Sequence, residues 1–217
     1  MSSREEPCDF GRPVRLVAGH MIGLPIAVVY TNALEWFVHK HVLHGMGKRR
    51  ENFWSFHWHD HHQASRKANM YDAQYVRPLF TWSPQGKELL ALVLTAAVHL
   101  LLFPVAPFFA GYIVVHAIRY YFLHKRAHLD AEWCRENVPW HYDHHMGKDQ
   151  NANWCVTHPW FDYVMGTRKK YTYDATGKPI AEEPVPKPKN FWARLVLPLF
   201  QGKRDRARVV RTTGAQS

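Results

Sequence analysis

The feature that most limits how this chain can fold is a run of thirty residues, Leu89 to Ile118, without Asp, Glu, Lys or Arg. As one straight helix the run would be about 45 Å long, at 1.5 Å per residue. Pro104 and Pro107 lie in its middle, and prolines there remove helical hydrogen bonds and end the helix. The run therefore predicts a hairpin of two helices, Lys87–Phe103 and Phe108–Phe122.

A second apolar segment follows a polar leader over residues 1–13. Leu16 to Leu34 are nineteen residues without a charged side chain, close to the roughly 20 that cross a bilayer core. Gly23 and Pro25 near its middle allow a kink or a re-entrant turn. Together the segments predict an all-α fold with membrane helices, one N-terminal segment plus the hairpin, whose short arms either thin the bilayer or only insert deeply.

Charge and cysteine content narrow the class of protein. The 217 residues carry a formal net charge of +10, and 47% are hydrophobic, which excludes a disordered chain. The three cysteines form no CxxC pair, so neither a disulfide framework nor a zinc ribbon is expected. We expect the protein to face a reducing compartment. The excess of basic over acidic residues predicts an anionic partner, either membrane headgroups or nucleic acid. The apolar hairpin and the lack of a nucleic-acid-binding motif favour the membrane.

Histidine is strongly clustered: of 16 in the chain, seven fall in residues 39–62 and six in residues 124–158. Imidazole is a common ligand of Fe, Zn, Cu and Ni. One metal ion uses three or four protein ligands, so this many clustered histidines predict two metal ions close together. The predicted ligands are His39, His44, His57, His61, His62, His124, His128, His141, His144 and His145.

The spacing within the second window suits helices, because residues three or four apart share a helix face. It groups His124 with His128, and His141 with His144 and His145.

In the first window the same rule pairs His57 with His61, and His59 with His62. His39 and His44 are five apart, about 140° around an α-helix, so one of them should lie where the helix ends.

Other residues near the motifs receive weaker assignments. Asp60 and Asp143 lie inside the histidine motifs, where each would orient a ligand ring through its second nitrogen. The roles of four histidines stay open: His41, His59, His116 and His158.

The hairpin decides whether the two windows can meet. If residues 89–118 crossed the membrane once, the windows would lie on opposite faces, whereas a turn at Pro104–Pro107 returns both to the same face. Lysines and arginines flank both windows, which predicts a cytoplasmic location for them.

Four histidine motifs stand in order along the chain: HKHVLH over 39–44, HWHDHH over 57–62, HKRAH over 124–128 and HYDHH over 141–145. Downstream, NWCVTHPWFDYVMGT over 153–167 places an Asn before Asp-x-x-x-Gly-Thr. This order resembles the fatty acid hydroxylase/sterol desaturase superfamily of integral-membrane di-iron enzymes, from about Glu35 to Thr167. The second motif departs from the superfamily by reading HxxxHH where HxxHH is commoner, which implies that His57 and His59 compete for one ligand role.

The resemblance implies a membrane-bound oxidoreductase that hydroxylates or desaturates a C–H bond of a lipid with O2. It implies two iron ions, or zinc in the isolated protein, and a separate electron donor such as a reductase, ferredoxin or cytochrome b5. The histidine motifs would face the cytoplasm from a bacterial inner membrane or the endoplasmic reticulum. Residues 1–175 would form the oxidase domain, and 176–217 a Pro-rich linker with a basic amphipathic tail.

Two alternatives remain open at this point. Within the enzyme class, the chain could be a carotenoid or sterol hydroxylase or a desaturase; its short length favours the hydroxylase branch. Outside that class, a non-catalytic histidine-rich membrane protein would bind metal without consuming O2.

Overall fold

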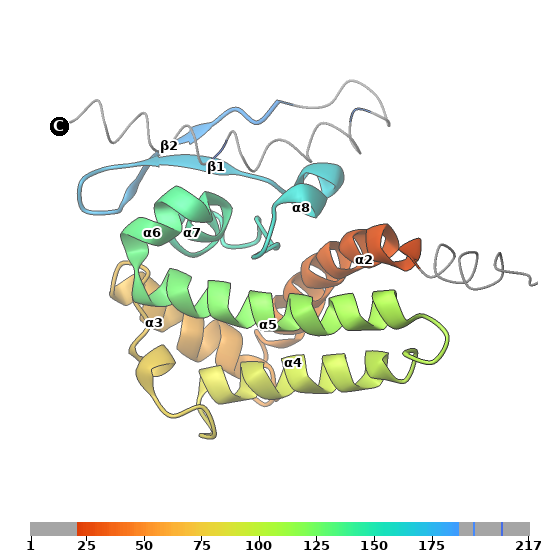
Figure 1. The fold of residues 1–217 in the computed structure, drawn as a ribbon. Coiled ribbons are helices and arrows are strands. Elements are labelled where there is room, and N and C mark those ends of the chain that lie inside the picture. Colours follow the sequence, from red (N-terminus) through yellow and green to blue (C-terminus); the bar gives the residue numbers. More distant parts are fainter. Residues whose placement is uncertain (1–20, 187–192, 194–204, 206–217) are drawn as a thin grey trace, which may run out of the picture.

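The hairpin is present in the computed structural model, which describes residues 21–186, Ala193 and Asp205. Helix α4 (Pro84–Leu100) and helix α5 (Pro107–Leu129) lie side by side and antiparallel (Figure 1). Ser83 caps α4 by accepting a hydrogen bond from the Gly86 amide. Each helix starts with a proline in its first turn, where no hydrogen bond is lost. The predicted turn is therefore confirmed, and α5 continues seven residues beyond the predicted end.

Helix α2 (Gly23–Phe37) packs against α5. A Cβ atom on Gly23 would lie only 3.2 Å from the Phe109 backbone nitrogen, so glycine allows the close approach of the two helices. Pro25 lies in the first turn of α2 and does not kink it. Among the described residues, no helix has both the length and the hydropathy needed to cross a membrane.

Two short segments coil more widely than an α-helix. Helix α2 runs on into η1 (Val38–Met46), and η2 (Phe56–His62) runs on into α3 (Gln63–Lys67). Both η1 and η2 are π-helical, with hydrogen bonds from residue i to residue i+5. They carry the two histidine motifs of the first window.

The remaining elements cover the histidine-bearing end of the hairpin. They are the 3₁₀ turn η3 (Ala73–Val76), α6 (Ala131–Asn137), α7 (Pro139–Met146), α8 (Trp160–Met165) and an antiparallel pair of strands, β1 (Lys170–Tyr173) and β2 (Pro179–Glu183). In Figure 1 the strands lie over α6 and α7, and the Tyr142 and Tyr173 rings meet at 4.9 Å.

The strand pair corrects the sequence prediction in one respect. The fold is mostly helical, but part of the expected linker over residues 175–190 is strand β2, which pairs with β1. Gly177, with φ of +79°, forms the turn between them. The division of the chain at residue 175 stays a prediction, and the amphipathic helix expected over residues 190–201 lies outside the described residues except for Ala193.

A buried ion network links Asp205 to this layer. Asp205 is buried and pairs with Arg168 and Lys170. Arg168 also pairs with Asp143 at 2.7 Å. The network therefore connects Asp205 with Asp143 of α7 and Lys170 of β1.

Candidate metal centre

Five buried histidines form the first group. Each presents one ring nitrogen, and these five atoms lie within 4.8 Å of one another. The π-helical coiling explains the grouping, because residues five apart lie near one face of a π-helix. His39 and His44 form one such pair, and His57 and His62 form another. The members are His39 and His44 of η1, His57 and His62 of η2, and His144 of α7.

A second group lies directly beside the first. It contains His61 of η2, His124 and His128 of α5, and His145 of α7, again with nitrogens within 4.8 Å. The tenth predicted ligand, His141, lies next to it, with its Nε2 atom 3.1 Å from Nε2 of His128. The rings of His62 and His145 stack across the two groups at 4.2 Å.

The nitrogen separations fit metal ligation. Two imidazole nitrogens bound to one metal at about 2.0–2.1 Å, at tetrahedral to octahedral angles, lie about 2.8–3.4 Å apart. Nε2 of His62 lies 3.0, 3.2 and 3.1 Å from Nε2 of His44, His57 and His144. Such a convergence of lone pairs is unfavourable unless a cation lies among them, so the residues present suit a metal ion.

Backbone carbonyls orient the first group. The Nδ1 atoms of His39 and His144 each lie 2.6 Å from a carbonyl oxygen, that of Trp154 and of Ala152. A neutral ring that donates from Nδ1 has a bare Nε2, which is the tautomer that a metal requires.

Carboxylates orient the second group. Asp72 accepts a hydrogen bond from Nδ1 of His61 at 2.9 Å, and Glu88 from Nδ1 of His124 at 2.8 Å. Tyr75 hydrogen-bonds to Glu88 as well. Neither carboxylate lies in a histidine motif, so spacing along the sequence did not point to them.

Burial keeps the clustered imidazoles neutral. Desolvation, reinforced by neighbouring histidines, holds the pKa of His57 and His62 well below the usual 6.5. Burial also lowers the pKa of His144 to about 3. A neutral imidazole can give its lone pair to a metal ion at physiological pH.

Several sequence predictions are corrected here. The His57 and His61 rings are neighbours, with 5.2 Å between centroids, but the two residues belong to different groups, His57 to the first and His61 to the second. Asp143 binds Arg168 and Tyr173 rather than a histidine, and Asp60 is exposed. The competition within the second motif is resolved, since His57 enters the first group whereas Nε2 of His59 faces the Lys48 carbonyl.

We call residues 153–167 the closing segment; its internal hydrogen bonds hold a loop in place beside the first histidine group. The Asp162 carboxylate accepts hydrogen bonds from the backbone amides of Trp154 and Cys155, both at 2.8 Å, and from the Thr167 hydroxyl at 2.7 Å. Gly166, with φ of +70°, ends α8 and lets the chain turn back. Asp162 therefore fixes the loop whose carbonyls orient His39 and His144.

Replacing Asp162 with alanine should lower the free energy of unfolding by about 2–4 kcal/mol, because buried amide donors lose their partner. Denaturant unfolding followed by circular dichroism measures it. Asp60→Ala, at an exposed carboxylate, is the control and should change stability by less than about 0.5 kcal/mol. Equal effects of the two substitutions would contradict the role given to Asp162.

An apolar cavity of about 400 Å³ opens beside both histidine groups. Residues from α2, η1, η2, α4 and α5 line it, with mostly aliphatic and aromatic side chains. His39 and His57 of the first group and His124 of the second belong to its wall.

One polar pair stands in the wall of this cavity outside the two groups. Glu35 accepts a hydrogen bond from Nε2 of His116 at 2.6 Å and from the amides of Val156 and Thr157 at 2.9 and 3.0 Å. The pair joins α2 and α5 to the closing segment. This gives His116 a place in the cavity wall and not among the grouped histidines.

The two other open histidines lie away from the centre. His41 is exposed and packs on Trp36 and Phe37. The ring of His158 packs on Trp140 at 6.0 Å.

Two adjacent groups of buried imidazoles, each of which could hold a metal ion, lie beside an apolar cavity. Residues 24–167 match the fatty acid hydroxylase family, and the chain belongs to that family. It is a family of lipid hydroxylases and desaturases, which supports an oxidoreductase. The chain has no match among curated proteins and none among solved structures.

Proposed function

We propose that this protein is a membrane-bound di-iron oxygenase that hydroxylates, or desaturates, a lipid C–H bond. The observation that carries the proposal is the pair of adjacent histidine groups at the wall of an apolar cavity, in a chain of this family. Hydroxylation is the reaction we favour.

The histidine groups supply the ligands. One iron would be held by the first group and the other by the second, with His141 beside it. Bound iron would supply O2 activation at the cavity wall. The carbonyls and carboxylates behind the rings hold Nε2 toward the metal, and burial keeps bulk water out.

The stoichiometry requires an external donor. Hydroxylation takes up O2, two electrons and two protons, inserts one oxygen atom and releases the other as water. Desaturation takes up the same reactants and releases two waters. In either case two electrons must reach the histidine groups from a separate reductase, ferredoxin or cytochrome b5.

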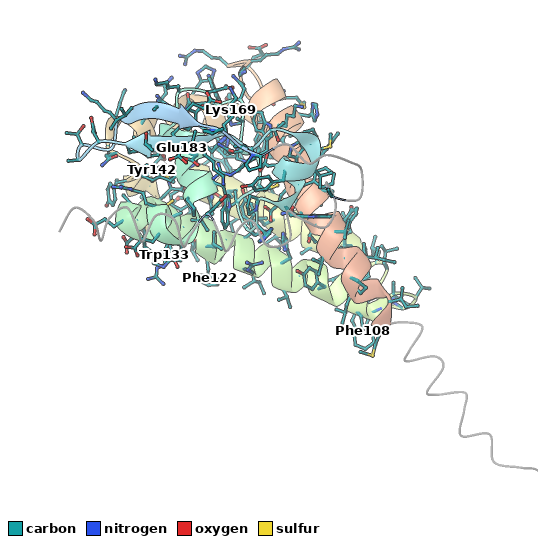
Figure 2. The ribbon with its side chains drawn as sticks, turned by 90° about the horizontal axis from the view of Figure 1, so that it is seen from above. Phe108, Phe122, Trp133, Tyr142, Lys169 and Glu183 are labelled. Carbon is teal, nitrogen blue, oxygen red and sulfur yellow. The ribbon has the colours of Figure 1, made fainter. Side chains whose placement is uncertain are left out.

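The exposed apolar surface supports membrane insertion. The turn of the hairpin exposes large side chains, with Leu101 78% and Val105 70% exposed. In Figure 2 Phe108 lies at the far end of the α4–α5 arm, opposite Lys169 and Glu183 of the histidine-bearing end. An exposed apolar surface of this kind is typical of a membrane contact. We propose that the arm enters the bilayer and that the histidine groups stay on its cytoplasmic side.

Placing aspartates at the turn, Leu101→Asp with Val105→Asp, should release the protein from membranes, because each charge in the bilayer costs about 2–3 kcal/mol. Membrane flotation measures the bound fraction. Leu101→Ala with Val105→Ala is the control and should stay bound. Full retention of the aspartate variant would contradict insertion through this turn.

The function is tested by expressing the protein in a host and profiling its lipids under ¹⁸O2, with elemental analysis of the purified chain. A hydroxylase should yield a lipid that gains one ¹⁸O, whereas a desaturase should yield one that loses two hydrogens. Both require bound iron. Metal binding without O2 consumption or lipid oxidation would overturn the proposal in favour of a non-catalytic metal-binding protein.

Enlarging a side chain in the cavity should impair substrate binding without changing the metal content. Ala117 lines the cavity on α5, so Ala117→Phe is expected to lower product formation about tenfold, or to shift it to shorter chains, by filling space. Product analysis at constant iron content checks this. Ala97→Phe, at an exposed position of α4 outside the cavity lining, should leave the product unchanged; equal losses would contradict the assignment of the cavity.

A further inference from the structure

A single aromatic side chain connects the surface with the first histidine group. The ring of Trp58 lies 5.0 Å from the ring of His44 and 5.4 Å from that of His62, measured between centroids. Nζ of Lys48 lies 5.0 Å from the Trp58 centroid. Lys48 is exposed and Trp58 is half-buried, so part of the Trp58 side chain is accessible to solvent.

The surface around Trp58 is basic. We define the basic rim as Lys48, Arg49, Arg50 and Arg66, all exposed. Nζ of Lys48 donates to Asn151 at 2.7 Å, and Arg66 donates to the carbonyls of His145 and Gly147, so these two residues flank the loop that follows α7. Arg49 and Arg50 come directly after Lys48 in the chain.

Carboxylates offset part of the charge of this surface. Glu51, Asp60 and Asp149 are the nearby acidic residues along the chain, and Asp149 pairs with Lys169 at 3.1 Å. The rim keeps an excess of positive charge over these groups. A negatively charged partner is therefore attracted to it.

The rim lies at the histidine-bearing end of the protein, because Arg66 donates to the His145 carbonyl. Glu88 of α4, which contacts His124 at this end, is thirteen residues from the exposed turn at Leu101, or about 20 Å along the helix at 1.5 Å per residue. The proposed reaction needs electrons from outside the chain, so an acidic electron-carrier protein is the partner for which we argue.

We infer that the basic rim is the docking surface for an acidic one-electron carrier protein, and that Trp58 is where its electrons pass to the first histidine group. This rests on the proposed function, which needs two electrons for each O2. Two reduced carriers of the ferredoxin type would each give up one electron per turnover. The electrons would pass to the metal that His44 and His62 would hold, and the two protons taken up from solvent would leave in the product water. Rim charges would set the encounter rate and its salt dependence.

The test uses the iron-loaded protein in lipid nanodiscs and a reduced acidic [2Fe–2S] ferredoxin as the probe. In the variant Arg49→Glu with Arg50→Glu, ferredoxin affinity at low salt should fall at least about tenfold, and the salt dependence of binding should flatten. Product driven by dithionite should be unchanged. The control reverses two exposed charges elsewhere, Arg126→Glu with Lys178→Glu, and should bind ferredoxin as the native chain does.

A second variant separates docking from electron transfer. Trp58→Leu should leave ferredoxin affinity unchanged but slow ferredoxin oxidation, and Trp58→Phe should restore part of the rate; a merely structural role would lower dithionite-driven turnover as well. Unchanged affinity in the rim variant overturns the inference. The inference also fails if the rim variant binds ferredoxin normally but loses binding to phosphatidylglycerol vesicles, because the rim would then belong to a membrane contact. If dithionite yields no product while ferredoxin still binds through the rim, the proposed function fails and the docking surface stands.

Discussion

Replacing His62 with alanine is expected to remove one of the two metal ions and to lower product formation at least about 100-fold. Nε2 of His62 lies within 3.2 Å of Nε2 of three other members of the first group, more than any other described member. Its loss leaves the group without its central ligand. Elemental analysis and product formation measure the two effects, with circular dichroism to check that the helices persist.

The matched control lies three residues away in the same motif. The ring of His59 faces the Lys48 carbonyl and belongs to neither group, so His59→Ala should keep both metal ions and nearly all activity. Full activity in His62→Ala, or equal losses in both variants, would remove the assignment of the first group.

The ligand set could be predicted from the sequence because it depends on residue type and clustering. Nine of the ten predicted histidines fall in the two groups and the tenth, His141, lies beside them. The hairpin could be predicted as well, because Pro104 and Pro107 interrupt an uncharged run that is too long for one straight helix.

The division of the ligands between the two groups could not be predicted. It depends on π-helical coiling at η1 and η2, which brings His39 near His44 and His57 near His62 across five-residue spacings. An α-helical period separates His39 from His44 and pairs His57 with His61 instead of His62, and nothing local in the sequence distinguishes the two coils.

The groups that orient the ligands could not be predicted from the sequence either. Asp72 and Glu88 come from segments without a histidine motif, and the carbonyls of Ala152 and Trp154 carry no side-chain signal. Asp143 was the natural choice from sequence, but Arg168 and Tyr173 take up its carboxylate. Such partners depend on tertiary packing.

The metal-free protein should unfold steeply as the pH falls below about 6.5. Burial holds the pKa of several grouped histidines, such as His39, His128 and His145, well below this value in the folded state, whereas unfolding restores it. The unfolded chain thus binds more protons below pH 6.5, so the stability present above that pH is lost as the pH decreases.

Each such histidine costs about 1.4 kcal/mol per pH unit below 6.5. Four of them at pH 5.5 would cost about 6 kcal/mol, comparable to the whole stability of a typical domain.

Bound metal should move this transition to lower pH, because protons must then displace the metal from the same nitrogens. Circular dichroism in detergent, followed from pH 8 to pH 4 with and without iron, measures both midpoints. The expected result is a transition of the metal-free protein that takes up several protons at once, and a lower midpoint when iron is bound. A shallow curve that is identical in the two forms would mean that the rings face water. It would contradict the buried, metal-ready centre on which the proposed chemistry depends.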